Sequence, residues 1–496
     1  MSEVEPVSGA PGSQSLPLPD YSRKWYVMSA IAMGIFLATI DGSIVNVALP
    51  TLTDKLDTDF ASVQWVVLAY LLTITTLQAV VGRLADMRGR KKLYNSGFVV
   101  FTIGSLLCGL SPTVGWLIAA RVLQGVGAAL ILALGMAIIT EAFPPSERGR
   151  ALGIAGSIVS IGIVTGPTLG GVIIENLSWH WIFFVNVPVG ILGTWLAWRY
   201  IPETRPPGGQ QFDMAGAATL CVFLLALLLG LTTGQREGFL SPQALGLFAA
   251  AAFFLATFII LERRHPQPII DPGMFRSALF RTNLATGFLV FVALGSGVLI
   301  PFYLENTLGY SVQQVGFLLA VVPIALGITA PISGALSDRL GSRPISVVGL
   351  AVTVLGFLTL STLTTETTAA GFALRYLPVG IGVGLFQSPN NSAIMGSVER
   401  KRLGVASSLL AITRSLGQTV GLAVLGAVWA SSVFRAAGGA VAGGAEAAPP
   451  AAQAAGLQVA SLVAAGLVTT ALVIALFAWR NERRVRTAGR LAESEE

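Results

Sequence analysis

The chain has 496 residues, of which 53% are hydrophobic and only 11% charged, and its mean hydropathy is +0.73. Soluble proteins carry about 25% charged residues, and here the charges fall in clusters between long uncharged runs, so a soluble fold is excluded and a polytopic membrane protein is predicted. Cys108 and Cys221 are the two cysteines and both lie in apolar runs, which excludes a disulfide framework or a cysteine metal site.

Residues 1–24 are rich in Pro, Ser, Gly and acids and lack the basic start of a cleavable signal peptide, so a disordered cytoplasmic tail is expected. Apolar runs of about 18–25 residues, bounded by charges or turn residues, predict transmembrane helices. Fourteen such runs occur, at 25–50, 62–84, 93–110, 114–140, 150–174, 179–199, 214–233, 242–261, 283–305, 312–337, 345–363, 370–395, 404–432 and 456–480. Segment 436–455 is expected to be a flexible outer loop.

The positions of Lys and Arg support this count and predict the orientation. With the N-terminus inside, the predicted cytoplasmic segments hold 25 of the 31 Lys and Arg residues, the opposite side holds 3, and 3 lie within spans. This distribution satisfies the positive-inside rule, and a missed or extra helix would reverse every later loop. The net charge of +6 is therefore explained by anchoring at the cytoplasmic side and not by nucleic-acid binding. Both termini are expected to be cytoplasmic.

Three sequence pairs at nearly one spacing predict an internal repeat. GRLADMRGRKK at 82–92 recurs as GALSDRLGSRP at 334–344, with an offset of 252. ARVLQGVGAAL and RYLPVGIGVGL place Arg121 and Arg375 254 residues apart, and GIVTG precedes GQTVG by 255. Six-helix halves repeated in parallel are typical of transporters with a site between the halves. The predicted parts are a tail (1–24), an N-terminal six-helix bundle (25–205), an inserted helix pair (206–270), a C-terminal six-helix bundle (271–480) and a cytoplasmic tail (481–496).

One carboxylate, Asp41, lies in the first apolar segment, FLATIDGSIVNVALP (36–50). It is about 16 residues, or roughly 24 Å, from the predicted helix start, well within a hydrocarbon layer about 30 Å thick. Burial disfavours an ionised carboxylate, and an acid inside a membrane is by default functional. We therefore expect Asp41 to be a proton site. The alternative is a static acid, either fully paired with a buried arginine or facing water.

Two arginines within spans need a partner or water, because an unpaired charge in lipid is costly. They are Arg121 in the fourth span and Arg414 in the thirteenth. We expect Arg414 to couple with Asp41 when the two halves approach, because protonation of Asp41 would weaken such a pair and bias the inward–outward equilibrium. The alternative for both arginines is a structural ion pair or a clamp on backbone carbonyls.

Several of these segments resemble one family. GRLADMRGRKK is similar to the helix 2–3 loop of the major facilitator superfamily, and LIAARVLQGVGAA (117–129) and GIVTGPTLGG (162–171) are similar to its helix 4 and helix 5 motifs. LATIDGSIVNVALP (37–50) and WHWIFFVNVPVG (179–190) resemble the fourteen-helix drug:proton antiporters of the QacA/EmrB type. The resemblance covers essentially all of residues 25–480. It implies an all-α major facilitator fold with 14 transmembrane helices arranged as 6 + 2 + 6.

The resemblance also implies roles for the motif residues. Asp41 and Arg121 would take part in proton coupling, and the helix 2–3 loop with its second copy would form a cytoplasmic gate; Met87 departs from the arginine that often follows the acid. The gate residues are Gly82, Asp86, Arg88, Gly89, Arg90, Asp338 and Arg339. The antiporter motif comprises Gly162, Gly166, Pro167, Gly170 and Gly171. From the residues alone, the loop is basic and topogenic, the glycines allow close helix packing, and the proline should kink its helix.

Polar and aromatic residues within the spans are candidates to line a substrate cavity, although each could equally be a packing or helix-bridging residue. They are Tyr70, Gln78, Gln124, Gln387, Asn390 and Asn391.

The sequence has no nucleotide-binding loop, nucleophile elbow or metal cluster, so we expect no enzyme activity, no metal and no cofactor. The energy source is then an ion gradient or the gradient of the substrate itself, and we expect a proton gradient. The predicted function is proton-coupled export of hydrophobic or amphipathic small molecules, as in multidrug efflux, by a monomer in a bacterial-type cytoplasmic (inner) membrane. The expected partners are a small-molecule substrate, protons and the lipid bilayer. Alternatives are export of a native lipid, siderophore or metabolite, and, in a different class, a membrane scaffold or sensor that transports nothing.

Overall fold

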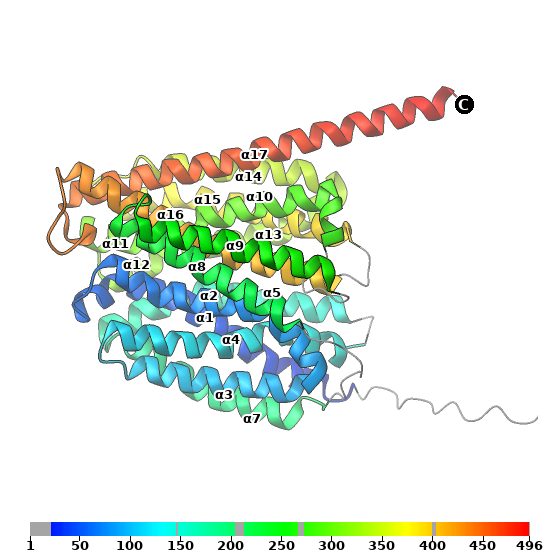
Figure 1. The fold of residues 1–496 in the computed structure, drawn as a ribbon, viewed down its shortest axis with the longest axis horizontal. Coiled ribbons are helices and arrows are strands. Elements are labelled where there is room, and N and C mark those ends of the chain that lie inside the picture. The colour runs from blue at the N-terminus through cyan, green and yellow to red at the C-terminus, as the bar shows by residue number, and fades with distance from the viewer. Residues whose placement is uncertain (1–20, 145–146, 204–212, 266–271, 399–402, 496) are drawn as a thin grey trace, which may run out of the picture.

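The computed structural model describes residues 21–144, 147–203, 213–265, 272–398 and 403–495, and its regular elements there are helices (Figure 1). The first half comprises α1 (Lys24–Lys55), α2 (Phe60–Arg88), α3 (Arg90–Gly109), α4 (Val114–Ala142), α5 (Arg148–Asn176), α6 (Trp181–Phe184) and α7 (Asn186–Tyr200). A hairpin follows, α8 (Met214–Glu237) and α9 (Pro242–Arg264). The second half comprises α10 (Ala278–Leu294), α11 (Ile300–Phe302), α12 (Val312–Leu319), α13 (Val321–Leu340), α14 (Ser342–Leu360), α15 (Ala369–Gly396), α16 (Leu403–Ala436) and α17 (Pro450–Glu495).

The predicted spans correspond to these helices. Thirteen helices within the described residues are long and apolar enough to cross a membrane. The predicted span 93–110 is helical as α3, but α3 is not among the thirteen, because it begins with three cations and carries Asn95 and Ser96 in its next turn. Most of the tail predicted at 1–24 lies outside the described residues, and α1 begins at Lys24. At the other terminus α17 continues without a break from the last predicted span into 481–495, and Figure 1 shows it extending past the bundle.

Two predicted spans of the second half are interrupted helices. Segment 283–305 runs from α10 through a 3₁₀ turn, Gly295–Leu299, into α11 and then a π-helical turn, Tyr303–Thr307. A Cβ at Gly295 would lie 2.5 Å from the Gly421 backbone, so α16 passes very close at this point. Segment 312–337 divides into α12 and α13 at Ala320. Pro301 and Pro323 follow the two breaks and lack the amide hydrogen that a continuous helix needs.

The backbone confirms the repeat and corrects one of its registers. Gly89 and Gly341, 252 residues apart, both have left-handed φ angles, of 92° and 86°. A Cβ at Gly104 on α3 would lie 2.6 Å from the backbone of Gln124, and one at Gly356 on α14 would lie 2.6 Å from that of Val379. Since Gln124 and Val379 are equivalent, α4 and α15 align with an offset of 255.

Arg121 therefore corresponds to Tyr376, and the expected equivalence of Arg121 and Arg375 is wrong by one residue. Arg375 instead donates to Thr362 Oγ1 at 3.0 Å and to the carbonyl oxygen of Gly371 at 2.9 Å. One residue along a helix is a rotation of about 100°. The two arginines thus lie on different helix faces. Within the described part of the second half, the position equivalent to Arg121 is a tyrosine, so the Arg121 environment described below is not repeated there.

Among the described residues, the two halves share an apolar core at one end of the bundle. We call this end, which carries residues 56–60, 303–311 and 436–450, the outer end, after the charge distribution that predicts its orientation; the opposite end is the basic end. At the outer end Phe60 of the first half shares one apolar core with Phe302 and Trp429 of the second. Toward the basic end the cores are separate, one built from α1, α4 and α5 and the other around Phe280 and Ile394.

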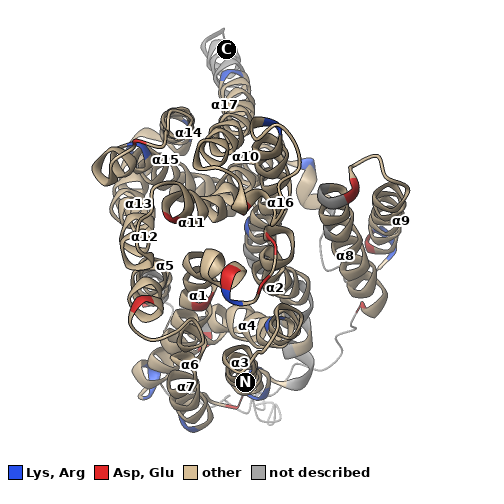
Figure 2. Cartoon of the chain, turned by 90° about the vertical axis from the view of Figure 1, so that its left-hand side faces the viewer, with Lys and Arg blue, Asp and Glu red and all other residues tan. Residues whose placement is uncertain are grey.

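Helices α8 and α9 pack on each other and lie beside the rest of the bundle, as Figure 2 shows in a view onto the outer end. Their contacts with the two halves run through α2 and α16. Leu220, Leu224 and Phe258 of the pair, for example, pack with Leu72 of α2 and Leu416 of α16. The inserted pair therefore covers the seam between the halves on one side and does not contribute to the site described next.

Candidate functional site

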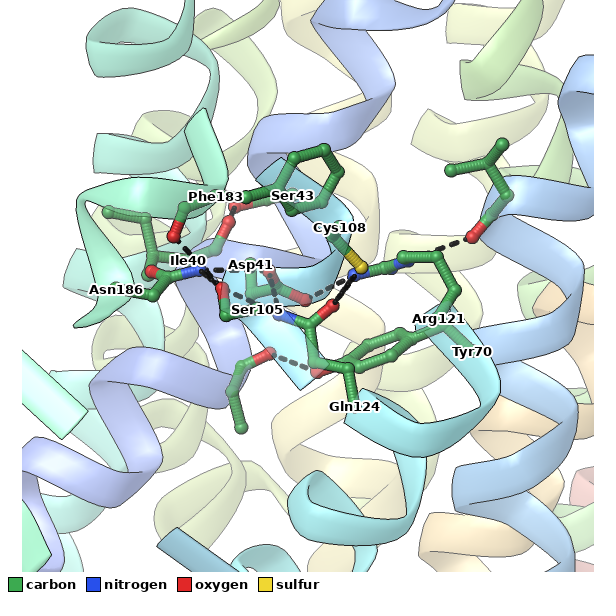
Figure 3. A network of polar contacts seen from close by, with 12 residues as sticks. Ile40, Asp41, Ser43, Tyr70, Ser105, Cys108, Arg121, Gln124, Phe183 and Asn186 are labelled. Carbon is green, nitrogen blue, oxygen red and sulfur yellow. Dashed lines mark hydrogen bonds and ion pairs between the residues drawn. The ribbon is translucent and has the colours of Figure 1, made fainter. Parts of the chain in front are cut away.

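Asp41 lies in the middle of α1 and is completely buried (Figure 3). Its Oδ2 accepts a hydrogen bond from Arg121 Nη1 at 2.5 Å, which makes a salt bridge between two side chains with 0% and 1% exposure. Both residues belong to the first half, since Arg121 is on α4. The carboxylate that the sequence singles out is therefore neutralised by an arginine of its own bundle.

Two amide side chains bind the other carboxylate oxygen. Gln124 Nε2 donates to Asp41 Oδ1 at 2.7 Å, and Asn186 Nδ2 donates to the same atom at 3.0 Å. Both amides also donate to Ser105 Oγ at 3.1 Å, and that hydroxyl donates to the Phe183 carbonyl oxygen at 2.9 Å. Elements α1, α3, α4 and α7 thus meet at one carboxylate, and every donor in the set favours its ionised form.

The guanidinium of Arg121 makes further contacts besides the salt bridge. Its Nε donates to the Val66 carbonyl oxygen at 2.9 Å and its Nη1 donates to Gln124 Oε1 at 2.7 Å. The Tyr70 ring lies 3.9 Å from the guanidinium carbon, and the Phe183 ring lies 6.0 Å away. A planar cation stacked on aromatic faces gains further stabilisation when desolvated. Buried ion pairs need additional hydrogen bonds of this kind to offset desolvation.

This arrangement determines what the site can do chemically. A proton that binds Asp41 would remove the negative charge and leave Arg121 buried without a counter-ion, which costs several kcal/mol. Protonation of Asp41 would therefore favour a rearrangement of α1 against α4. Among the described residues no group of three or more His, Cys, Asp and Glu could hold a metal ion.

Arg414, expected to pair with Asp41, is not one of its partners in this conformation. Its side chain is exposed on α16, and among the described residues it makes no hydrogen bond or ion pair. In this conformation Asp41 pairs with Arg121 instead, because α4, which carries Arg121, packs against α1 within the same bundle.

The residues expected to line a cavity differ in how far they are buried and in what they contact. Tyr70 and Gln124 are buried in the Asp41 network, with the Tyr70 hydroxyl donating to the Ala38 carbonyl oxygen at 3.1 Å, so neither can contact a solute in this conformation. Gln78, Gln387 and Asn391 are half-buried. Asn390 is buried, and its Oδ1 has no hydrogen-bond partner.

Sequence reasoning missed three members of the network, Ser105, Asn186 and Cys108. The Cys108 thiol lies 3.5 Å from Gln124 Oε1 and is buried. Asn186 falls within WHWIFFVNVPVG, whose resemblance to the antiporter segment was the available signal. Nothing in the sequence around Ser105 distinguishes it from a helix-packing serine.

The gate residues are partly described. Gly89, with φ 92° and ψ 135°, separates α2 from α3, and Arg90 donates to Glu141 on α4. Arg339 is exposed near the end of α13. The surroundings of Gly82 and the side chains of Asp86, Arg88 and Asp338 lie outside the described part of the chain.

The antiporter motif lies on α5 and contacts other helices on two faces of that helix. A Cβ at Gly162 or Gly166 would strike the Oγ atoms of Thr39 and Ser43 on α1, at 2.1 and 1.9 Å, and one at Gly170 would meet Ile44 at 2.7 Å. These three glycines therefore hold α5 against α1 beside Asp41, as the small-residue spacing predicts.

The other face of α5 contacts the opposite half. A Cβ at Gly171 would lie 2.6 Å from the Val312 carbonyl oxygen, and one at Gly316 would lie 2.2 Å from the carbonyl oxygen of Pro167. Backbone thus meets backbone between α5 and α12. The motif joins the halves as well as the helices of one half.

Comparison with known proteins agrees with the geometry. The family model described as Major Facilitator Superfamily matches residues 31–422. The riboflavin transporter RibZ of Clostridioides difficile is 33% identical over 83% of this chain and 89% of its own, and the multidrug transporter protein MdtP of Bacillus subtilis is 32% identical over 82% and 75%. A bacterial homologue of the human lysosomal transporter Spinster, solved in an inward-facing and unoccupied conformation, superposes with a TM-score of 0.67 at 18% identity over 92% of this chain and 97% of that one.

Proposed function

The chain belongs to the major facilitator superfamily, a family of membrane transporters and not of enzymes, and from this premise we propose that it exports hydrophobic or amphipathic small molecules in exchange for protons. The proposed location is a bacterial-type cytoplasmic membrane, crossed fourteen times, with both termini in the cytoplasm. The multidrug transporters among its relatives support the substrate class, and the site supports the energy source.

The observation that carries the proposal is the fully buried Asp41–Arg121 pair. A proton taken up by Asp41 releases Arg121, so the charged and neutral forms of the carboxylate favour different packings of α1 and α4. A group of this kind converts a proton gradient into a conformational preference, because a ligand shifts an equilibrium only by its differential affinity for the two states.

Exchange requires two conformations, one open to each side of the membrane, and the arrangement of the halves supports one of them. In this conformation the halves share a core at the outer end and keep separate cores toward the basic end. We propose that this is the inward-open state, in which solute enters from the cytoplasm. The Asp41 network would then become accessible to outside protons once the outer end opens. Arg414, exposed and without an ion-pair partner in the described chain, remains our candidate to approach the network in that second state.

A second candidate function is transport of a defined metabolite, and the similarity to a riboflavin transporter favours it. The same coupling machinery would serve either substrate class. Accumulation of one compound in a deletion strain, with unchanged sensitivity to toxic cations and dyes, would identify the chain as a metabolite transporter.

The test is transport in proteoliposomes under an imposed pH gradient, comparing wild type with Asp41→Asn across a panel of dyes, neutral drugs and riboflavin. Asp41→Asn should abolish uphill transport and leave downhill equilibration of the same solute measurable. Asp57→Asn is the matched control, because Asp57 is an exposed acid just after α1, and it should behave as wild type.

Removing one partner of a buried pair typically costs about 3–5 kcal/mol, so Asp41→Asn alone could unfold the protein. The double variant Asp41→Asn/Arg121→Gln removes both charges and should fold while remaining uncoupled. Uphill transport at the wild-type rate by either variant would contradict the proton-coupled mechanism.

A further inference from the structure

Helices α3 and α7 form a continuous groove on the outside of the first half. A Cβ at Gly190 would lie 2.1 Å from Thr102 Oγ1, and one at Gly193 would lie 2.4 Å from the Phe98 ring, so the two helices touch closely at their centre. Along one side of this contact runs a groove in two sections of about 490 Å³ each. The sections share Asn95, Val99 and Trp198, which makes them parts of one channel.

The groove is polar at one end and apolar along the rest. Its end at the start of α3 is lined by Lys91, Lys92 and Glu203, and its remainder by Val99, Ile103, Ile191 and two tryptophans. Trp195 and Trp198 are 52% and 64% exposed, and Ile191 is 62% exposed. From Lys92 to Ile103 the groove spans eleven residues of helix, roughly 17 Å. That length matches one leaflet of a hydrocarbon layer about 30 Å thick.

We propose that this groove binds one anionic phospholipid of the basic-end leaflet, with its phosphate on Lys91 and Lys92 and an acyl chain along Val99, Ile103 and Ile191. Exposed apolar side chains at this depth are expected to face hydrocarbon, and exposed tryptophans beside them typically lie at headgroup level. The shape is therefore that of an amphipath with a charged head and a tail about one leaflet long.

The charges favour a headgroup with net negative charge. Two lysines face one carboxylate, and the Lys92–Glu203 contact is long, 3.8 Å, between side chains 76% and 68% exposed, so it competes weakly with a phosphate. Each lysine close to an anionic membrane surface contributes to such attraction. Asn95 lines both sections, so its amide can bind a headgroup hydroxyl. Phosphatidylglycerol offers both groups.

The site lies next to the gate loop. Lys91 and Lys92 directly follow Arg90, which binds Glu141 on α4, and Gly89, where α2 turns into α3. A phospholipid in the groove would hold the first turn of α3 against the last turn of α7. The inference needs only that the chain resides in a membrane, so it stands or falls separately from the transport proposal.

The experiment is native mass spectrometry of the purified protein released from micelles containing equal amounts of phosphatidylglycerol, phosphatidylethanolamine and phosphatidylcholine. Wild type should retain one phosphatidylglycerol in preference to the other two. The double variant Lys91→Gln/Lys92→Gln should lose about tenfold in that preference. Arg263→Gln/Arg264→Gln, which removes two adjacent cations at the end of α9, should not.

A second variant keeps the test decisive if the charge variant fails to fold. Val99→Trp fills the apolar section without changing any charge and should reduce retention of the same lipid. Photolabelling with a phosphatidylglycerol that carries a diazirine on its acyl chain should mark α3 and α7 peptides above all others. Equal retention of the three lipids, labelling spread over all membrane-facing helices, or displacement of the lipid by a transported dye would each overturn the proposal.

Discussion

Glu446 Oε1 accepts a hydrogen bond from the backbone N–H of Phe60 at 2.6 Å, although the two residues are 386 positions apart in the chain. Phe60 is the first residue of α2 in the first half, whereas Glu446 lies between α16 and α17 in the second. The segment 436–455, for which the sequence predicts only a flexible outer loop, thus reaches across to the other half. The Phe60 ring packs against Phe302 and Trp429, at 5.2 and 5.0 Å, in the same place.

The first prediction is that closure of the outer end strengthens as the pH outside falls. Burial raises the pKa of Glu446, the nearby Asp59 and Asp54 raise it further, and the Phe60 N–H opposes them. When the outer end opens, this carboxyl is hydrated and returns toward its ordinary pKa of about 4.3. The closed state therefore binds the proton more tightly. Its stability relative to the open state increases as the pH falls through the raised pKa, and the increase ends once the pH is low enough to protonate the open state too.

The measurement is a spin-label distance between Lys55→Cys and Glu366→Cys, both exposed at the outer end, in a background with Cys221 replaced; Cys108 is buried and stays. The open population should increase from acid to neutral pH in wild type. Glu446→Gln imitates the protonated form and should make the open population less dependent on pH. An undiminished pH response in Glu446→Gln would assign closure to other acids.

A second prediction concerns the contact of α5 with α12. Gly316→Ala places a Cβ 2.2 Å from the Pro167 carbonyl oxygen, so the helices must separate. We expect about 1–3 kcal/mol less stability for the closed outer end, as for other overpacked sites, seen as a larger open population in the same distance measurement. Gly327→Ala, which meets open space on α13, is the control. Equal behaviour of the two variants would show that this contact does not hold the end closed.

Most of the fold follows from the sequence because its determinants are local or repeated. Apolar length and charge clusters predict the helices, and the repeated loop motif predicts that Gly89 and Gly341 occupy equivalent turns, which their φ angles confirm. The breaks at Gly295 and Ala320 could not be predicted in this way. They depend on which helix passes nearby, as α16 does at Gly295. The sequence of one helix does not show which other helices will pack against it.

The same distinction between local and tertiary determinants applies to the residues of the candidate site. Asp41 and Arg121 are conspicuous because charges within apolar segments are costly, and each required a partner. The sequence could not show that they are partners of each other, since any of several packings would bring an arginine near Asp41. Ser105 resembles any helix-packing serine, and Asn186 is marked only by the segment in which it lies. The folded arrangement of α3 and α7 around α1 is what places both in the Asp41 network.

A third prediction follows from Asn186. Asn186→Leu removes one of the donors to Asp41 Oδ1 and keeps the branching of the side chain, so it favours the protonated carboxyl. A hydrogen bond to a charged group is worth about 1.5–3 kcal/mol, and one pH unit corresponds to about 1.36 kcal/mol. The pH of half-maximal proton-driven transport should therefore rise by about one to two units. Asn176→Leu, at the exposed end of α5, should leave the profile unchanged, and an unshifted profile in Asn186→Leu would mean that this amide does not tune the site.

The last prediction tests whether the two gate turns are equivalent in energy as well as in position. Gly89 and Gly341 combine φ of 92° and 86° with extended ψ of 135° and 154°, a conformation open to glycine but strained for any residue with a Cβ. Gly89→Ala and Gly341→Ala should each lower the free energy of unfolding by about 1–3 kcal/mol, whereas Gly466→Ala in α17, which meets open space, should not. Because the turns belong to different halves, their effects should add in the double variant, as measured by unfolding in detergent. A double variant no less stable than either single one would mean that the turns are energetically linked across the basic end, where the structure keeps the two cores apart.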